Sequence, residues 1–583
     1  MTDELLSELD PEMLALLWAD DTDDSAIKKQ HKIEGPLSFS QYRLWMLQQL
    51  DPAMIAYNMP RALLFHGQLN TDKLVYAFQQ LINKHAVFRT QYHDNNGQPL
   101  QRIIENKAFT LEALPLDTSC NNAEQLLEQE QVKSWFNRPF DLTTGELLRA
   151  SLISLNASES VLLIDYHHIA SDAWSNGIIL QDLAKAYQGE TLAELDISYL
   201  DFAYWQNEYL TSDNSQANKD YWLTYLSEDI QPIALPTDHQ RPDFQSFSGK
   251  NTAIVLEKNT VNQLKVFCKK HDVTPFMVLL ATWQVLLSRF SNQGSFAVGV
   301  PTAARKQAEL QSIVGFFVNT QIYKADLNAA YSVKALIEHI RNHTLNLLEQ
   351  ETLPLDWLLE NINITRSTNR SPLFQVLFDY KTEETLSEQI GDIRLSPIMV
   401  ETTTSKLELE LSVLMGESHA KINLSYQTAL FNSHTANSLL ENYNYLLLQM
   451  LNQPSCAIGN LTISPVQTDQ LLAIGSNETS YEQDTLVHEL IEQQARSTPN
   501  AIALVFEDET LTYQVLNARA NQLAHYLIAQ GVQPEDTVGI AVERSVEMVV
   551  GLLAILKVGG AYVPIEPSLP KARIEYIMQS SGL

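Results

Sequence analysis

The chain is poor in cysteine and in basic residues, and both shortages limit what it can be. Only three of its 583 residues are cysteines, Cys120, Cys268 and Cys456, far apart and without the spacing of a metal or redox site. We therefore expect a reduced, cytoplasmic protein. Lys and Arg number 39 against 70 Asp and Glu, which gives a net charge of −31. Nucleic acids and anionic membranes bind basic surfaces, so we expect neither as a partner.

Targeting and membrane-spanning segments are also missing from the sequence. The N-terminus, Met1–Glu4, is acidic where a signal peptide has a basic region followed by an apolar one. No run reaches the roughly 18 apolar residues of a membrane span. Hydrophobic residues make up 45% of the chain and charged residues 19%, enough to build packed cores. A chain of this length predicts roughly three or four folding units.

Changes in composition divide the chain into a main body, two linkers and a C-terminal unit. Asp3–Asp20 carries leucine and methionine at near-helical spacing, and charged residues continue to 32 as a linker. This first segment is either a docking helix for another polypeptide or a frayed start, and the sequence leaves both open. Helix and strand patterns interleave over Leu37–Gln453, which predicts an α/β or α+β fold. Residues 454–485 are irregular and polar, a second linker, and a βαβ-type unit follows at 486–583.

The clearest helices and strands can be placed from periodicity. We expect helices at Asn70–His85, Thr260–His271, Leu486–Ser497, Tyr513–Gln530 and Val546–Val558. We expect strands at Phe296–Val300, Ile502–Phe506 and Val538–Val542. No glycine-rich phosphate-binding loop occurs between these last elements and Leu583.

The segment Tyr166–Ser175 carries the candidate chemistry. It follows a strand-like apolar run and precedes a helical pattern that begins near Asn176. Side chains alternate along a strand, so His167 and His168 are expected to point to opposite faces, one toward a reaction site and one into structure. An imidazole titrates near pH ~6.5, a range suited to taking a proton from an amine and returning it. Asp172 is expected to accept hydrogen bonds at the junction after the strand.

A plainer interpretation of the same segment stays open at this point. Adjacent histidines that end a strand are more often partly buried structural residues than catalysts. A metal site is less favoured still, because neighbours on opposite strand faces cannot bind one ion.

Further segments decide between these interpretations because they occur together and in order. The His-His-x-x-x-Asp segment of His167–Asp172 is one of six, the others being Leu37–Trp45, Lys84–Thr90, Tyr199–Gln206, Val314–Thr320 and Ser371–Val376 after Arg366. A further segment, Gln350–Trp357, is a weak match. Over Leu37–Gln453 the chain thus resembles the condensation domain of nonribosomal peptide synthetases.

The resemblance implies a fold and a set of site residues. The fold is two chloramphenicol-acetyltransferase-like lobes, at 33–190 and 191–453, in a V-shaped pseudo-dimer with a tunnel between them. By motif position His168 is the catalytic candidate, whereas His167 and Asp172 support the site. Arg305 lies where the family places the partner of Asp172 across the lobes, and a buried carboxylate needs such a charge partner. A solvated surface position is the alternative for Arg305.

Further site neighbours come from the same motifs: Ala173, Trp174, Ser175 and Asn319. Ala173 departs from the family, which usually has glycine there, and Ala86 stands where glutamate is usual. Alanine adds a methyl group near the tunnel and removes easy access to positive φ, so we expect a modest change of rate or substrate choice. No metal is implied.

The C-terminal unit resembles the start of an adenylation domain. Leu511–Tyr513 and Leu556–Pro564 match the first two motifs of that family, and the third, the phosphate loop, is not in the chain. We therefore expect residues 486–583 to be a partial α/β adenylation subdomain that does not use ATP. Such a part is expected to expose unpaired strand edges and to fold poorly.

The resemblance implies amide-bond formation between thioesters that enter on 4'-phosphopantetheine arms, without a directly bound cofactor. The implied partners are an upstream donor carrier protein in trans and a downstream acceptor carrier domain. Alternatives within the fold are a starter condensation with a fatty acyl donor, epimerisation of a carrier-bound residue, and a non-catalytic recruitment domain. The last usually lacks the second histidine. A heterocyclising subtype, which has aspartate in place of the histidines, is excluded by His167 and His168.

Overall fold

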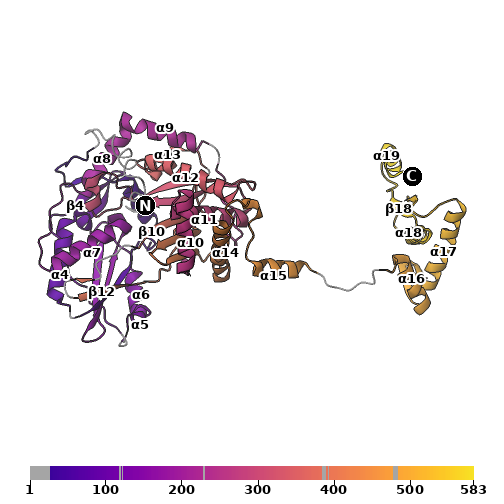
Figure 1. Cartoon of the computed structure of the whole chain (residues 1–583), viewed down its shortest axis with the longest axis horizontal. Helices are drawn as coiled ribbons and strands as arrows, with labels where there is room; N and C mark the ends of the chain where they lie inside the picture. Colours follow the sequence, from indigo (N-terminus) through magenta and orange to yellow (C-terminus); the bar gives the residue numbers. More distant parts are fainter. Residues whose placement is uncertain are drawn as a thin grey trace. The chain divides into compact units, whose positions relative to one another are not determined.

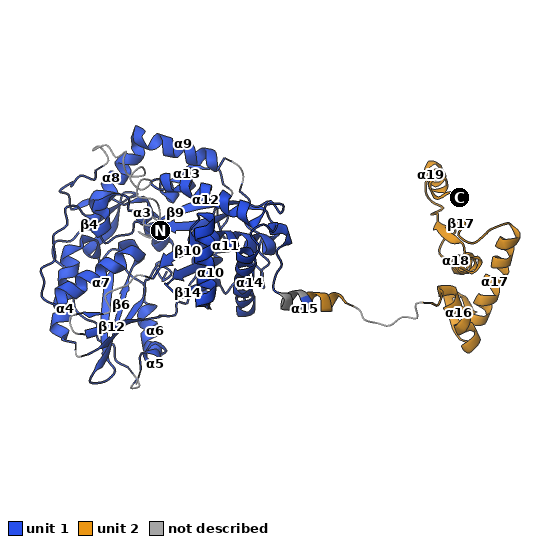
Figure 2. Ribbon diagram, viewed as in Figure 1, with its two compact units in different colours: residues 1–470 blue, residues 471–583 orange. Residues whose placement is uncertain are grey.

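A computed structural model describes residues 26–583, apart from residues 68, 117–119, 121, 228–229, 365, 384–388, 391–392 and 477–483. The chain divides into two compact units, residues 1–470 and 471–583 (Figures 1 and 2). The amphipathic segment predicted at Asp3–Asp20 lies outside the described residues.

Unit 1 contains two lobes, and the first is built around a five-stranded sheet. In spatial order the strands are β11 (Gln389–Ile390), β12 (Ile393–Ile398), β2 (Arg61–His66), β6 (Glu159–Tyr166) and β5 (Leu148–Ser154). A small three-stranded sheet lies beside it, in the order β1 (Glu34–Pro36), β4 (Gln98–Ile103) and β3 (Thr90–Asn95). The helices of this lobe are α3 (Phe39–Leu50), α4 (Thr71–Lys84), α5 (Ala123–Leu127), α6 (Glu130–Phe136) and α7 (Ala173–Tyr187).

Both faces of the five-stranded sheet are covered, which explains the continuous apolar run of β6. Leu162 and Ile164 face the core shared with α4 and α7, whereas Val161 and Leu163 face a second core shared with α5 and α6. A strand buried on two faces is apolar at every position instead of alternating with polar residues. Strand β6 therefore holds the turn that follows Tyr166 inside the lobe.

The second lobe is built on a six-stranded sheet. Its strands, in spatial order, are β7 (Gly249–Leu256), β14 (Ala420–Gln427), β13 (Leu409–Met415), β10 (Val376–Thr382), β8 (Ser295–Thr302) and β9 (Asn319–Asp326). Its helices are α9 (Gln216–Tyr225), α10 (Lys258–His271), α11 (Pro275–Ser291), α12 (Val333–Glu349), α13 (Leu355–Asn361) and α14 (Ser433–Asn452), whereas α8 (Tyr199–Thr211) packs against β1 and the core of the first lobe. Helices α10, α11 and α14 lie side by side and pack against the sheet (Figure 1). Mixed parallel and antiparallel pairing in this sheet fits the expected α/β fold.

Segments from the sequence range of the second lobe join the first lobe. Strands β11 and β12 fall within the range predicted for the second lobe, yet β12 pairs antiparallel with β2 of the first, with Arg394 opposite His66. The loop between β8 and β9 also enters the first lobe, where Leu310 and Phe316 join its core. The lobes are therefore not separable at one point of the sequence.

Unit 2 is built from two pairs of short strands and the helices beside them. The strands are β15 (Ile502–Phe506) with β16 (Glu509–Thr512), antiparallel, and β17 (Thr537–Ile540) with β18 (Ala561–Pro564), parallel. The helices are α16 (Val487–Ser497), α17 (Tyr513–Ala529), α18 (Val546–Val558) and α19 (Lys571–Ser581). Ile502 and Val505 on β15 are more than half exposed, at 62% and 68%. Apolar strand surface is thus uncovered in this unit.

Most predicted elements are present with small shifts at their ends. The predicted helix at Thr260–His271 begins two residues earlier, at Lys258, and the strands and helices predicted in unit 2 are found. The helix expected from Asn176 begins at Ala173 because the Asp172 carboxylate caps it.

The segment predicted as the second linker is partly structured. Within residues 454–485, Ile458 and Leu461 are buried, and Arg289 donates to the Ile458 carbonyl at 2.7 Å. Helix α15 (Pro465–Gly475) follows them. Packed structure of unit 1 therefore extends past Gln453.

Within the described ranges, no single helix is long and apolar enough to cross a membrane, and α10 with α11 passes that test only as a pair bent by 105°.

Candidate active site

The two adjacent histidines follow strand β6 and diverge. β6 ends at Tyr166, His167 forms an isolated bridge with Asn58, and His168 begins a short 3-10 turn to Ala170. The pair is thus not on the strand as expected, but the side chains do point apart. His167 is buried against Phe140, and His168 lines a cavity.

His167 holds the turn that carries His168. The His167 Nδ1 accepts a hydrogen bond from the Ile169 backbone N–H at 3.1 Å, and the ring lies edge-on to Phe140. Burial lowers the pKa of His167 to about 3, with the charge of Lys406 acting in the same direction. Its imidazole is therefore neutral at neutral pH and serves as an acceptor for the backbone.

His168 presents one ring nitrogen to the cavity. Its backbone N–H donates to the Tyr57 carbonyl at 2.9 Å, and its Nδ1 lies 2.8 Å from the Ser171 carbonyl oxygen. A carbonyl only accepts, so Nδ1 carries the proton and Nε2 keeps its lone pair. The ring packs edge-on against Phe316, with centroids 4.6 Å apart. Burial, followed by the charge of Lys406, lowers the pKa of His168 well below its usual value.

The cavity beside His168 has a volume of about 2710 Å³ and is lined by both lobes. Tyr57 and Trp174 come from the first lobe, and Lys406 comes from the second. A space of this size can hold two extended substrate groups together.

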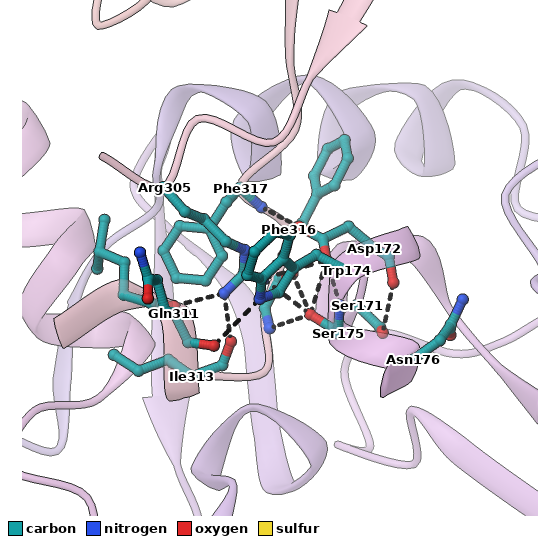
Figure 3. A network of polar contacts seen from close by, with 12 residues as sticks. Ser171, Asp172, Trp174, Ser175, Asn176, Arg305, Gln311, Ile313, Phe316 and Phe317 are labelled. Atoms are coloured by element: carbon teal, nitrogen blue, oxygen red, sulfur yellow. Dashed lines mark hydrogen bonds and ion pairs between the residues drawn. The ribbon is translucent and has the colours of Figure 1, made fainter. Parts of the chain in front are cut away.

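Asp172 and Arg305 form a buried ion pair between the first lobe and the β8–β9 loop (Figure 3). Arg305 Nη2 lies 3.1 and 3.2 Å from the two Asp172 carboxylate oxygens, and its Nη1 donates at 2.6 Å to the carbonyls of Leu310 and Ile313. The Phe317 N–H also donates to Asp172 at 3.0 Å. The solvated alternative for Arg305 is excluded, since its side chain is 2% exposed.

Ser175 closes the same network (Figure 3). Its hydroxyl lies 2.7 Å from Asp172 and 2.9 Å from Arg305, and it bonds both the N–H and the carbonyl of Gly315 at 3.1 Å. A side chain at Gly315 would overlap the Tyr199 ring, so only glycine permits this approach. The motifs around residues 172, 199 and 315 therefore meet at one point.

The remaining predicted neighbours are divided between cavity and interior. Ala173 and Trp174 line the cavity, whereas Ser175 and Asn319 do not. Asn319 donates to the carbonyls of Glu351 and Leu353 at 2.8 and 2.7 Å, and so connects β9 to the segment before α13. Ala173 is the first residue of α7 with ordinary helical φ, so it adds a methyl group to the cavity wall without backbone strain.

Three cavity residues beside His168 were not found from the sequence: Tyr57, Phe316 and Lys406. Phe316 lies inside the Val314–Thr320 motif, but nothing in the pattern shows that its ring meets an imidazole. Tyr57 and Lys406 belong to loops of different lobes, and only the folded chain brings them together. Within the described ranges, no group of three or more His, Cys, Asp or Glu side chains could hold a metal ion.

The fold and this site are those expected of a condensation domain, and comparison with solved structures agrees with the fold. A four-domain nonribosomal peptide synthetase bound to AMP and glycine superposes with a TM-score of 0.78, at 22% identity, over 94% of this chain and 43% of that one. The X-domain from teicoplanin biosynthesis superposes with a TM-score of 0.68, at 21% identity, over 75% of this chain and 99% of that one. The fold is therefore that of the chloramphenicol-acetyltransferase-like lobes, as expected.

The chain belongs to the condensation-domain family. The family model "Condensation domain" matches residues 31–473, and "AMP-binding enzyme" matches residues 491–583. Bacitracin synthase 2 of Bacillus licheniformis is 36% identical over 560 residues, which cover 96% of this chain and 21% of that protein. Tyrocidine synthase 3 of Brevibacillus parabrevis is 36% identical over 548 residues, which cover 94% of this chain and 8% of that protein. The chain thus spans about a fifth or less of the length of these curated relatives.

Proposed function

We propose that the two lobes of unit 1 together form an amide bond between a donor thioester and an acceptor amine. One observation carries the proposal: the His168 ring lines a cavity shared by two lobes and has one nitrogen fixed to Ser171, which leaves Nε2 for a substrate. Membership of the condensation-domain family supports the same chemistry.

The reaction balances with one proton relay. The neutral acceptor amine attacks the donor carbonyl carbon and forms the C–N bond. The nitrogen loses a proton, the C–S bond breaks, and the departing sulfur gains a proton, so an amide and a thiol result. Nε2 of His168 is placed to accept the proton from nitrogen and return it to sulfur.

The lowered pKa of His168 shapes this role. At neutral pH the His168 imidazole is unprotonated and can accept a proton, but it is a weaker base than a free histidine side chain. A positioned base contributes roughly 10²–10⁴-fold to such a step. Holding the two reactants together in the cavity therefore contributes a further large share.

The substrates and partners follow from the same proposal. Donor and acceptor reach the cavity as thioesters on 4'-phosphopantetheine arms, from an upstream donor carrier protein in trans and a downstream acceptor carrier domain. Membership of the condensation-domain family supports the use of carrier-bound substrates. The low cysteine content of the chain favours the reducing cytoplasm. Residues 486–583 do not use ATP in this proposal.

The test is product formation by the full chain. Donor and acceptor are supplied as aminoacyl or fatty acyl thioesters on separate carrier proteins, and the amide is measured by mass spectrometry. His168→Ala is expected to reduce the rate by roughly 10²–10⁴-fold, whereas the control His434→Ala, at an exposed histidine of α14, leaves it unchanged. Product at near the wild-type rate from His168→Ala contradicts the proposed role of the imidazole. The two donors separate peptidyl transfer from starter condensation.

A further inference from the structure

The six-stranded sheet of the second lobe turns a polar face to the cavity that His168 lines. In β13, Ser412 lines this cavity, whereas its neighbours Leu411 and Val413 pack in the core behind the sheet. Side chains alternate along every strand, so the adjacent strands present the same face. We call six of the polar side chains on this face the sheet wall: Asn251, Asp379, Glu410, Ser412, Asn423 and Ser425.

The strand register sets the sheet wall in two rows. Asn251, Ser425 and Glu410 lie opposite one another across β7, β14 and β13, and Asn423, Ser412 and Asp379 lie opposite one another across β14, β13 and β10. From the spacing of strands and residues, each row spans about 10 Å and the rows lie about 7 Å apart. The wall is thus large enough to carry an extended chain of about three residues.

The uncharged members of the sheet wall have hydrogen-bonding capacity to spare. Asn423 donates to the Ser425 hydroxyl at 3.4 Å, and among the described residues its side-chain oxygen has no partner. Within the same part of the chain, the Ser412 hydroxyl has no partner either. Both side chains are therefore free to bond a polar substrate.

The charged members are already engaged by the protein. Glu410 Oε1 accepts a hydrogen bond from the Lys406 backbone N–H at 2.6 Å, and Asp379 lies 2.6 Å from the Lys381 ammonium. Burial lowers the pKa of Lys406, and the charge of Glu410 opposes that shift. The groups that the wall offers to a substrate are therefore mainly neutral ones.

The first row of the sheet wall lies close to the catalytic candidate. Lys406, whose backbone bonds Glu410, places its Nζ 5.1 Å from the centre of the Tyr57 ring. Tyr57 lies edge-on to the His168 ring, with centroids 6.5 Å apart. A chain that begins at His168 can therefore continue along the wall.

The first lobe lines the same cavity with apolar side chains, among them Met59, Ile179 and Leu180. A peptide suits such a mixed lining, because its backbone amides can bond the sheet wall while its side chains contact apolar groups. An alkyl chain displaces water from the wall and leaves the polar groups without partners, which costs binding free energy.

We propose that the sheet wall holds the donor chain and selects a peptidyl donor over a fatty acyl donor. This inference rests on the proposed function and names the substrate class of its donor. The acceptor carries its amine next to its own thioester, so most of an acceptor need not pass His168. The donor reacts at its carbonyl carbon, so the whole chain beyond that carbon has to lie in the cavity.

The test compares two donors on the same carrier protein and with the same acceptor: N-acetyl-alanyl-alanyl and octanoyl, whose chains have equal length. We expect the wild type to use the peptidyl donor with a kcat/KM about tenfold or more above that of the octanoyl donor. The double variant Ser412→Val and Asn423→Leu makes the wall apolar and is expected to lower this ratio about tenfold. Ser396→Val is the matched control, because Ser396 is a partly buried serine of β12 that does not line the cavity. It is expected to keep the wild-type ratio.

A second measurement does not depend on activity. Pantetheine analogues of the two donors, with an amide in place of the thioester, compete for the full chain in saturation-transfer NMR. The peptidyl analogue is expected to displace the octanoyl analogue from the wild type and to lose this advantage in the double variant. Ser412→Ala replaces the double variant in both assays if the latter loses its native circular dichroism spectrum.

The outcomes separate the two proposals. A wild type that uses the octanoyl donor as well as the peptidyl donor overturns the inference. A donor ratio that is unchanged in the double variant also overturns it, because the wall would then bind the acceptor or the pantetheine arm that both donors share. Absence of amide product from the wild type with either donor contradicts the proposed function, while competition between the analogues still decides whether the wall prefers a peptide.

Discussion

Removal of the Asp172 carboxylate is the sharpest test of how the site is held together. The carboxylate accepts hydrogen bonds from Ser175, from Phe317 and from Arg305, whose guanidinium is also buried. In Asp172→Ala the Arg305 charge stays in the interior with no carboxylate beside it, and its remaining partners are neutral: the carbonyls of Leu310 and Ile313 and the Ser175 hydroxyl. Breaking a buried ion pair in this way costs about 3–5 kcal/mol.

Urea unfolding followed by tryptophan fluorescence measures this cost for unit 1 alone, because all eight tryptophans lie before residue 471. With a slope of about 3 kcal/mol per molar urea, the midpoint is expected to fall by about 1–2 M. Asn70→Ala is the matched control: Asn70 is the exposed N-cap of α4 and accepts the Lys73 N–H at 2.9 Å. Its loss costs about 1 kcal/mol. A shift in Asp172→Ala no larger than that of the control would refute the view that the pair does more than cap α7.

Two further predictions concern the same region. Gly315→Ala forces the Tyr199 ring away from the network and is expected to lower the free energy of unfolding of unit 1 by about 1–3 kcal/mol, measured by the same urea assay. Unchanged stability would show that the close packing at Gly315 is not required. The pKa of His167 in the folded chain is about 3, so between pH 3 and pH 6.5 the folded chain binds fewer protons than the unfolded chain. The free energy of unfolding therefore falls as the pH is lowered through that range, by up to about 1.4 kcal/mol per pH unit. His167→Asn keeps an acceptor for Ile169 and is expected to show a shallower loss between pH 6.5 and pH 4; an equal slope in both proteins would contradict the assignment.

The family resemblance carried by the motifs implies the two-lobed fold and the pairing of Asp172 with Arg305, and the structure shows both. The structure gives the physical reason for these residue types: a carboxylate that caps α7, a guanidinium that matches its charge, and a glycine that allows a ring to approach. Periodicity gives β15 and α18 at their full lengths, since apolar repeats and turn residues bound both.

What the sequence does not give depends on contacts between distant segments. The 3-10 turn at His168 replaces the expected strand because the His167 ring bonds the Ile169 N–H, a contact that alternation along a strand does not include. The sequence indicates an ordinary surface lysine at Lys406, and only the folded second lobe places its ammonium over the Tyr57 ring. The membership of β12 in the first sheet likewise has no local signal.

The insertion of β12 beside β2 has a consequence for biosynthesis. His66 cannot meet Arg394 until the ribosome has added the intervening residues, which takes roughly 15–65 seconds at about 5–20 residues per second. During that time β2 offers an open edge to any nascent chain nearby. Newly made polypeptide thus passes through an aggregation-prone stage, and chaperone supply, more than final stability, is expected to set the yield when the protein is produced in a foreign host.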